Sequence, residues 1–388
     1  MKIPSLCLSL LLLLLAPLRA TPEFRGAWVA TVFNLDWPSK PGLPAAEQKA
    51  ELRAILNRAQ QLKLNAILLQ VRSVSDACYS SQREPRSEFL SGKQGRDPGY
   101  DPLAFAIVEA HARGIELHAW FNPFRAGTKP AGSYAANHVT HTHSEWVRPY
   151  GTQLWVDPGE PDARRYILDV ILDVVKRYDI DGVHIDDYFY PYPIKGAEFP
   201  DDASWRRYGA GSGLTRADWR RDNINRFVEA LYHGVKAQKP AVRVGISPFG
   251  IWRPRVPATI EAQLDAYAQL YADARHWLSE GWCDYLAPQL YWGTEPAKQS
   301  FPVLLNWWRE QSRVGRPIWP GIATERIGKS RPAEEIARQI DMTRQGLAAE
   351  AAPGNIQWSM KALMQDQGGV GEVLQREVYS ERAELPGR

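Results

Sequence analysis

The chain has 388 residues, of which 44% are hydrophobic and 23% are charged, so it can bury a large core. Its formal net charge is only +3. This near balance argues against a nucleic acid as the main partner, because binding to a phosphate backbone requires a strongly basic surface.

The N-terminus has the layout of a secretory signal peptide. Lys2 precedes the apolar run LCLSLLLLLLAPL, and a small residue follows at Ala20. The run is too short for a comfortable transmembrane span, and an uncleaved anchor is the alternative. Removal of residues 1–20 lowers the formal net charge from +3 to +1. We expect a mature chain of residues 21–388 in the periplasm or secreted, with no stable membrane insertion after cleavage.

Downstream of the leader, apolar runs typical of strands alternate with amphipathic runs typical of helices. The predicted strands are residues 25–32, 66–72, 116–123, 181–188, 243–249, 285–292, 318–325 and 356–363. The predicted helices are residues 47–62, 101–113, 161–178, 218–238, 259–280, 297–313 and 332–346, with a last helical segment near 370–379.

This alternation predicts an α/β fold, since strands separated by helices pair in parallel through crossovers. Eight such units match a closed (β/α)8 TIM barrel in number and length. A doubly wound open sheet is the alternative, but it would need a Gly-rich phosphate-binding turn after an early strand, and none is present. No interdomain linker is visible, so we predict a single domain.

The loops after the first four predicted strands are long. They cover residues 33–46, 73–100, 124–160 and 189–217. Active sites of this fold are built from the loops that follow the strands. The long loops therefore predict an elongated cleft at that end of the barrel.

The fourth predicted strand, DGVHIDDY, ends in two adjacent carboxylates. Side chains of a barrel strand point alternately to the interior and to the surrounding helices. Val183 and Ile185 form the apolar set that faces the helices, so His184 and Asp186 point inward, with Tyr188 after them. Asp187 has the opposite parity unless the strand has already ended. The two acids are therefore not equivalent.

The same alternation sends polar side chains to one rim from several other strands. They are Gln70, Arg72, His118, Trp120, Asn122, Gln289, Tyr291, Ser359 and Lys361. The seventh strand ends at Thr324 and Glu325. A barrel built for stability alone does not need such a set, so this rim is the candidate site.

Two carboxylates that flank the scissile bond are the working groups of glycoside hydrolysis, one as acid and the other as nucleophile or base. Asp186 is the candidate nucleophile or base, and Glu325 is the candidate acid. Asp187 competes for either role. The structural alternatives are that Asp186 is bonded to Arg72 or Lys361 and that Glu325 is an ordinary surface residue.

Aromatic and histidine side chains supply further candidates. Trp37 and Trp292 follow strand ends and are candidate platforms for sugar rings, with burial in the core as the alternative. His138, His141 and His143 resemble a metal cluster, but no acid or cysteine completes a recognisable spacing. We predict a polar loop there, no metal site and no cofactor.

Two cysteines remain in the mature chain. The predicted layout places Cys78 and Cys283 at opposite ends of different strands. We therefore expect both thiols to be unpaired.

Several motifs carry a family resemblance. RGAWVATVFNLDWP, LLQVRSVSDACYSS, HAWFNPFR, DGVHIDDYFYP and LAPQLYWG resemble the glycosyl hydrolase-like family of bacterial envelope proteins over residues 23–365. DGVHID is also similar to the strand-4 pattern D-G-[FI]-R-x-D of the distantly related alpha-amylase superfamily, whose last Asp is the nucleophile and corresponds to Asp186. Two departures stand out: His184 replaces the Arg, and VGISPFG lacks the Glu that serves as acid. Glu325 therefore rests on position alone.

The resemblance implies a glycosidase of the bacterial periplasm or cell surface that acts on peptidoglycan glycan strands, particularly strands stripped of stem peptides. The matched motifs place these residues at the site: Asn34, Asp36, Arg72, Asn122, Arg125, Asp186, Asp187, Tyr188, Gln289 and Tyr291. The candidate substrate contacts also include Trp37, His184, Trp292 and Lys361. We predict a secreted glycoside hydrolase whose partner is the cell-wall glycan, with any cell-division or envelope protein partners left open.

Three alternatives stay open. A non-catalytic glycan-binding barrel is suggested by the missing strand-5 Glu. A hydrolase of another polysaccharide would use the same cleft. A metal-dependent hydrolase would use the histidine loop.

Overall fold

The computed structural model describes residues 22–295, 297–346 and 352–387. The expected signal peptide, residues 1–20, lies outside the described residues. In the described part of the chain, no helix is both long and apolar enough to cross a bilayer.

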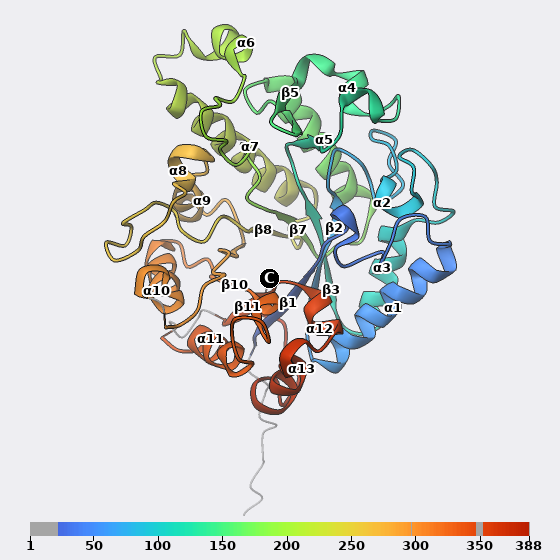
Figure 1. The fold of residues 1–388 in the computed structure, drawn as a ribbon, viewed down its shortest axis with the longest axis vertical. Coiled ribbons are helices and arrows are strands. Elements are labelled where there is room, and N and C mark those ends of the chain that lie inside the picture. Colours follow the sequence, from blue (N-terminus) through green and yellow to red (C-terminus); the bar gives the residue numbers. More distant parts are fainter. Residues whose placement is uncertain (1–21, 296, 347–351, 388) are drawn as a thin grey trace, which may run out of the picture.

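Eight parallel strands form a curled sheet at the centre of the molecule (Figure 1). Their order is β10-β11-β1-β2-β3-β7-β8-β9. The two edges meet through bridges between Leu286 and Ile318 and between Gln289 and Gly321, so the sheet closes into a barrel. The strands are β1 (Phe24–Val29), β2 (Ala66–Arg72), β3 (Glu116–Phe121), β7 (Gly182–Ile185), β8 (Arg243–Ile246), β9 (Tyr285–Leu286), β10 (Gly321–Ile322) and β11 (Gly354–Gln357). The predicted α/β barrel is confirmed.

Helices surround these strands, with α1 and α3 on one side of the barrel and α10 and α11 on the other (Figure 1). The longer helices are α1 (Ala45–Gln61), α3 (Pro102–His111), α5 (Pro161–Arg177), α7 (Arg216–Gln238), α10 (Phe301–Gln311) and α11 (Glu334–Arg344). The shorter ones are α2 (Glu88–Ser91), α4 (Val139–Thr142), α6 (Asp202–Ser204), α8 (Ala266–Gln269), α9 (Ala274–Glu280), α12 (Met360–Met364) and α13 (Val370–Val373).

The long loop after β3 has a sheet of its own. Its three antiparallel strands are β4 (Arg125–Gly127), β5 (Val147–Tyr150) and β6 (Gln153–Val156), in the order β4-β6-β5. This small sheet stands beside the carboxyl ends of β3 and β7, because β4 begins shortly after β3 and Trp155 Nε1 of β6 donates to the carbonyl of Phe189, just after β7. The predicted loop is therefore a fixed wall of the site.

Several predicted elements are wrong in their extent, and the strands expected at 285–292 and 318–325 are limited to β9 and β10. The helix expected at 259–280 is divided into α8 and α9, because Asp265 and Asp273 each accept a hydrogen bond from a backbone N–H and cap a new helix start. The strand expected at 356–363 ends at Gln357, and α12 begins at Met360. Lys361 therefore lies on a helix and not on a strand.

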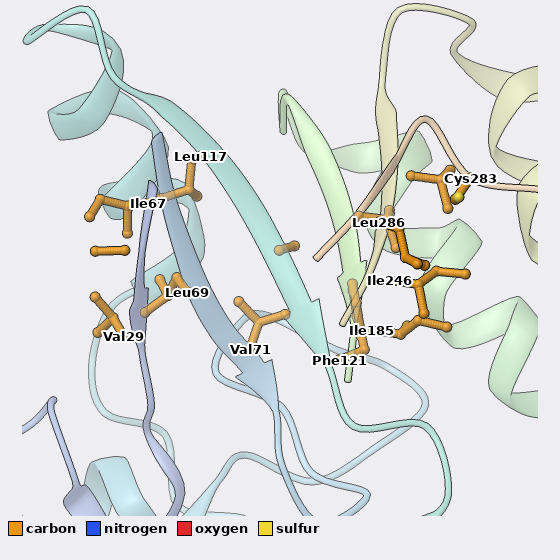
Figure 2. Packing of buried hydrophobic residues seen from close by; sticks show 14 of the residues in the cluster. Val29, Ile67, Leu69, Val71, Leu117, Phe121, Ile185, Ile246, Cys283 and Leu286 are labelled. Carbon is orange, nitrogen blue, oxygen red and sulfur yellow. The ribbon is translucent and has the colours of Figure 1, made fainter. Parts of the chain in front are cut away.

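The core has two layers that follow the alternation of the strands. Phe24, Trp28, Leu68, Trp120, Tyr285, Trp319 and Ile356 fill the barrel interior. The opposite strand faces pack against the helices, and Figure 2 shows Ile67, Leu69 and Val71 on one face of β2 within this outer layer. Cys78 and Cys283 are both buried and free, which confirms the expectation that they do not pair.

Candidate active site

Asp186 follows β7 directly and is enclosed at the carboxyl end of the barrel. Val183 and Ile185 belong to the outer layer, as the alternation predicts, so Asp186 returns to the interior side. Its Oδ2 accepts hydrogen bonds from Trp120 Nε1 at 2.9 Å and from Asn122 Nδ2 at 3.1 Å. Only 4% of its surface is exposed. The two donors fix the orientation of this carboxylate.

Asp187 is also enclosed, with 2% of its surface exposed. The hydroxyl of Tyr192 donates to its Oδ2, and the amide of Gln289 is a second donor. Gln289 also donates to the carbonyl of Ser247 at 3.1 Å, which holds the amide in place. The adjacent acids therefore have separate sets of neutral donors.

Burial dominates the electrostatics of this pair. Burial first and the charge of Asp187 second raise the pKa of Asp186 to about 7, against the opposing effects of Arg125 and Trp120. Burial likewise raises the pKa of Asp187, against the hydrogen bonds from Tyr192 and Gln289. In the described part of the chain neither carboxylate forms an ion pair with a cation. No salt bridge in the described residues therefore offsets the cost of ionising this pair.

Arg125 is the cation whose charge acts on both Asp186 and Asp187. Its guanidinium lies 4.6 Å from the ring centroid of Tyr188, and its Nε donates to the carbonyl of Ser73 at 3.3 Å. The side chain is thus held against an aromatic ring, a favourable place for a guanidinium. From there its charge lowers the pKa of Asp186 and of Asp187.

Asp36 ties the loop after β1 to the start of α12. Its Oδ2 accepts from Ala30 N at 2.8 Å, and its Oδ1 accepts from Ser359 Oγ at 2.6 Å and Lys361 N at 2.7 Å. The structure therefore brings together Asp36 and Lys361, two predicted site residues far apart in sequence. Asn34 lies in the same loop, and its Nδ2 donates to the carbonyls of Pro38 and Phe89.

Glu325 lies in a short 3-10 turn after β10, and its side chain is 45% exposed. Arg326 Nε lies 3.5 Å from its Oε1. Burial raises the pKa of Tyr291, and the charges of Asp187, Glu325 and Asp186 raise it further. Glu325 and both aspartates therefore lie close enough to Tyr291 for their charges to act on it. Its role as an acid stays a prediction.

Two predicted substrate contacts are wrong, because their side chains are fully buried. The indole of Trp37 offers no face to a sugar, and its Nε1 donates to the carbonyl of Gln48 at 2.9 Å. Arg72 forms a bidentate pair with Glu84 at 2.8 and 2.7 Å. This pairing also removes the alternative in which Arg72 neutralises Asp186.

His184 is a third predicted contact that the structure places out of reach. It is fully buried inside the barrel, where its Nε2 accepts from Trp28 Nε1 at 3.2 Å and its Nδ1 lies 3.0 Å from the hydroxyl of Tyr285. Burial lowers the pKa of His184 well below its usual range, so the ring is neutral. We expect His184 to have a structural role in the barrel interior beneath the site and no contact with the substrate.

The remaining predicted contacts keep some surface at the rim, except Asn122, which is buried beneath Asp186. Tyr188, Gln289, Tyr291 and Trp292 are partly exposed. Trp292 packs edge-on against Phe249 with a centroid distance of 5.7 Å. It stays a candidate platform.

Sequence reasoning placed Trp120 among the inward-pointing rim residues without giving it a role at Asp186, and it missed Tyr192 and Trp358 as site residues. Trp358 packs near Trp28, Trp120 and Tyr291, but the predicted strand ran past it. Tyr192 lies in an irregular loop, where no periodicity reports a side chain's direction.

The three histidines of the loop at residues 138–143 each contact a different part of the chain. His138 Nε2 lies 3.0 Å from the carbonyl of Val74, whereas His141 Nε2 lies 3.2 Å from the carbonyl of Tyr134. His143 stacks on Trp146. Among the described residues, no three His, Cys, Asp or Glu side chains are grouped to hold a metal ion.

Solved structures support the fold. The glycoside hydrolase domain of PgaB (BpsB) from Bordetella bronchiseptica aligns with a TM-score of 0.57 at 15% identity, covering 94% of this chain and 100% of that one. Alpha-L-fucosidase isoenzyme 2 from Paenibacillus thiaminolyticus aligns with a TM-score of 0.55 at 13% identity, covering 92% of this chain and 50% of that one. Identities this low show the fold alone.

Sequence relatives are closer. Glycosyl hydrolase YngK of Bacillus subtilis (strain 168) is 42% identical over 377 residues, covering 94% of this chain and 73% of the relative. Glycosyl hydrolase DigH of Escherichia coli (strain K12) is 35% identical over 355 residues, covering 84% of this chain and 80% of the relative. A family model described as glycosyl hydrolase-like 10 matches residues 23–337. With its barrel and its rim of carboxylates, this chain belongs to the glycosyl hydrolase-like 10 family.

Proposed function

We propose that the protein is a glycoside hydrolase that cleaves the glycan strands of bacterial cell-wall peptidoglycan, in the periplasm or outside the cell. Strands stripped of stem peptides are the proposed substrate. The observation that carries the proposal is the buried Asp186, whose raised pKa and neighbouring carboxylate suit acid–base or nucleophilic work at the carboxyl end of a barrel strand. Family membership supports the reaction class.

In the proposed mechanism, Asp186 is the nucleophile or general base that acts at the anomeric carbon. When ionised, it attacks that carbon or removes a proton from the attacking water. A second carboxylic acid gives its proton to the glycosidic oxygen, which leaves as a hydroxyl group. Glu325 is the proposed acid, and Asp187 is its rival. Water completes the hydrolysis in either case, so the products are two sugars with free hydroxyl groups.

Rings at the rim suit a sugar substrate. Tyr291, Trp292 and Trp358 are partly exposed, and aromatic faces bind the apolar faces of pyranose rings. Arg125 and Gln289 add polar groups close to the acids. Recognition of a long polymer would need further contacts beyond this rim.

A second candidate function is a glycan-binding barrel without catalysis. It is favoured by the half-exposed position of Glu325 beside Arg326 and by β8, which contributes no carboxylate. This candidate predicts binding to glycan strands without release of reducing ends.

The test is an Asp186→Asn variant assayed on purified, stripped glycan strands, with reducing ends and product masses measured. We expect a folded protein with activity reduced at least ~100-fold, as for the loss of a general base or nucleophile. The matched control is Asp179→Asn, an exposed aspartate before β7 at the opposite end of the barrel. Activity within about tenfold of wild type for Asp186→Asn would contradict the assignment. Binding without cleavage by the wild type would support the second candidate.

A further inference from the structure

A cavity of about 920 Å³ lies beside the candidate active site, between residues 191–199 and helix α8. Pro191 and Pro193 line it, and Tyr192 between them donates to Asp187. One short segment therefore contacts the carboxylate pair and also forms a wall of the cavity. A polymer bound at the carboxylates would reach this cavity by passing Tyr192.

The wall is held in place by the small sheet in the loop after β3. Tyr150, at the end of β5, accepts a hydrogen bond from Ile194 N at 2.8 Å and donates one to the carbonyl of Ala197 at 3.0 Å. Ile194 also packs closely on Gly151, where an added Cβ would lie 2.5 Å from Ile194 Cδ1. The cavity is therefore preformed, which lowers the entropy cost of binding.

The lining combines aromatic rings with amides. Tyr190 lies at the floor, with its ring centroid 4.9 Å from that of Tyr271 and 5.2 Å from that of Phe199. Gln263 and Gln269 stand at the edge. Rings with a few polar groups are typical of small-ligand sites and suit the mixed surface of a sugar.

The charges of the lining leave one cation without a counterion. Arg220 is paired with Asp201 at 2.7 Å and has Glu198 at 3.5 Å. Lys195 is exposed, and within the described residues it forms no ion pair. The cavity therefore favours a ligand that carries an anionic group near Lys195.

We propose that this cavity is a second sugar-binding subsite, distant from the cleaved bond, in which Lys195 pairs with a carboxylate on the sugar. The proposal rests on the proposed function. Removal of the stem peptide from a peptidoglycan strand leaves a free lactyl carboxylate on every second sugar. Lys195 therefore supplies a physical reason for preferring stripped strands, because a peptide-bearing strand has an amide at that position.

The test is a binding measurement by calorimetry in the Asp186→Asn background, which prevents cleavage. The probes are stripped strands and the same strands with their carboxylates converted to methylamides. We expect the anionic strands to bind about three- to fivefold more tightly, the range for an exposed ion pair, and this preference to weaken with salt. Lys195→Ala should abolish the preference, and Lys195→Arg should retain it.

Lys176→Ala is the matched control, because Lys176 is an exposed lysine in the last turn of α5, at the opposite end of the barrel. It should leave the preference unchanged. Filling the cavity with Ala268→Trp should weaken the binding of both strands, whereas Ala268→Ser should not. An unchanged preference in Lys195→Ala overturns the proposal.

Cleavage by the wild-type protein separates the two proposals. If the wild type cleaves stripped strands but Lys195 has no effect on their binding, only the subsite is wrong. If the wild type neither cleaves nor binds stripped strands, the proposed function is wrong.

Discussion

The carboxyl ends of β2 and β7 both carry buried charges, but only those at β2 are neutralised. Arg72 and Glu84 form two hydrogen bonds of 2.8 and 2.7 Å, and both side chains are almost fully buried. Asp186 and Asp187 are equally buried, yet they are like charges with neutral donors. Loss of one partner from the compensated pair would leave a buried charge alone, whereas the uncompensated pair holds carboxylates with perturbed pKa values at the rim.

The pKa of Arg72 and the pKa of Asp186 are both raised, but a raised pKa favours the charged form of an arginine and the neutral form of an aspartate. Burial lowers the pKa of Arg72, but the charge and hydrogen bond of Glu84 raise it above its ordinary value, which favours the charged form. For Asp186 burial and Asp187 raise the pKa to about 7, which disfavours the charged form. Perturbed carboxylates of the second kind gather at functional sites.

The largest expected effect is that of Glu325→Gln, which tests whether Glu325 acts as the general acid together with Asp186 and Asp187. If Glu325 protonates the leaving oxygen, Glu325→Gln should lower kcat on glycan strands ~10²- to 10⁴-fold. A substrate with an activated aryl leaving group should lose far less, because that group needs no proton. Glu334→Gln, at an exposed position at the start of α11, is the control. A loss below tenfold would move the acid role to Asp187.

The compensated region is tested by Glu84→Gln. Removing one partner leaves Arg72 buried and charged, so the free energy of unfolding should fall by about 3–5 kcal/mol in urea denaturation. The exposed pair of Asp162 and Arg165 gives the comparison, and Asp162→Asn should cost less than about 1 kcal/mol. Equal costs for the two variants would mean that burial does not distinguish these pairs.

The smallest expected effect on kcat is that of Tyr192→Phe, because Tyr192 is a neutral hydrogen-bond donor to Asp187. Tyr192→Phe removes one hydrogen bond to Asp187, and the pKa of Asp187 should rise because that bond lowers it. We expect kcat to fall about two- to tenfold, the range for one hydrogen bond. Steady-state kinetics with stripped strands measures this change. A loss as large as that of Asp186→Asn would give Tyr192 a direct part in the reaction.

The sequence predicts the barrel well, because strands that alternate with helices imply parallel pairing. The alternation of apolar residues within a strand then reports the direction of each side chain. Val183, Ile185 and Asp186 lie on the faces that this alternation assigns. It could not reveal that Glu84 pairs with Arg72, since that contact is made by an irregular loop. Tyr192 was missed for the same reason. The predicted last strand was too long because the strand stops at Gln357, although the apolar pattern continues into α12.

The pH dependence of kcat/KM tests the central claim most directly, in the wild type and in Asp187→Asn. Asp186 must be ionised to act as nucleophile or base, so the acidic limb of the kcat/KM profile should rise with its midpoint near pH 7. Asp187→Asn removes a like charge, which lowers the pKa of Asp186 and should shift this rise about one unit toward acid. A wild-type rise centred near pH 4, the ordinary pKa of an aspartate, and unmoved in Asp187→Asn would contradict the account.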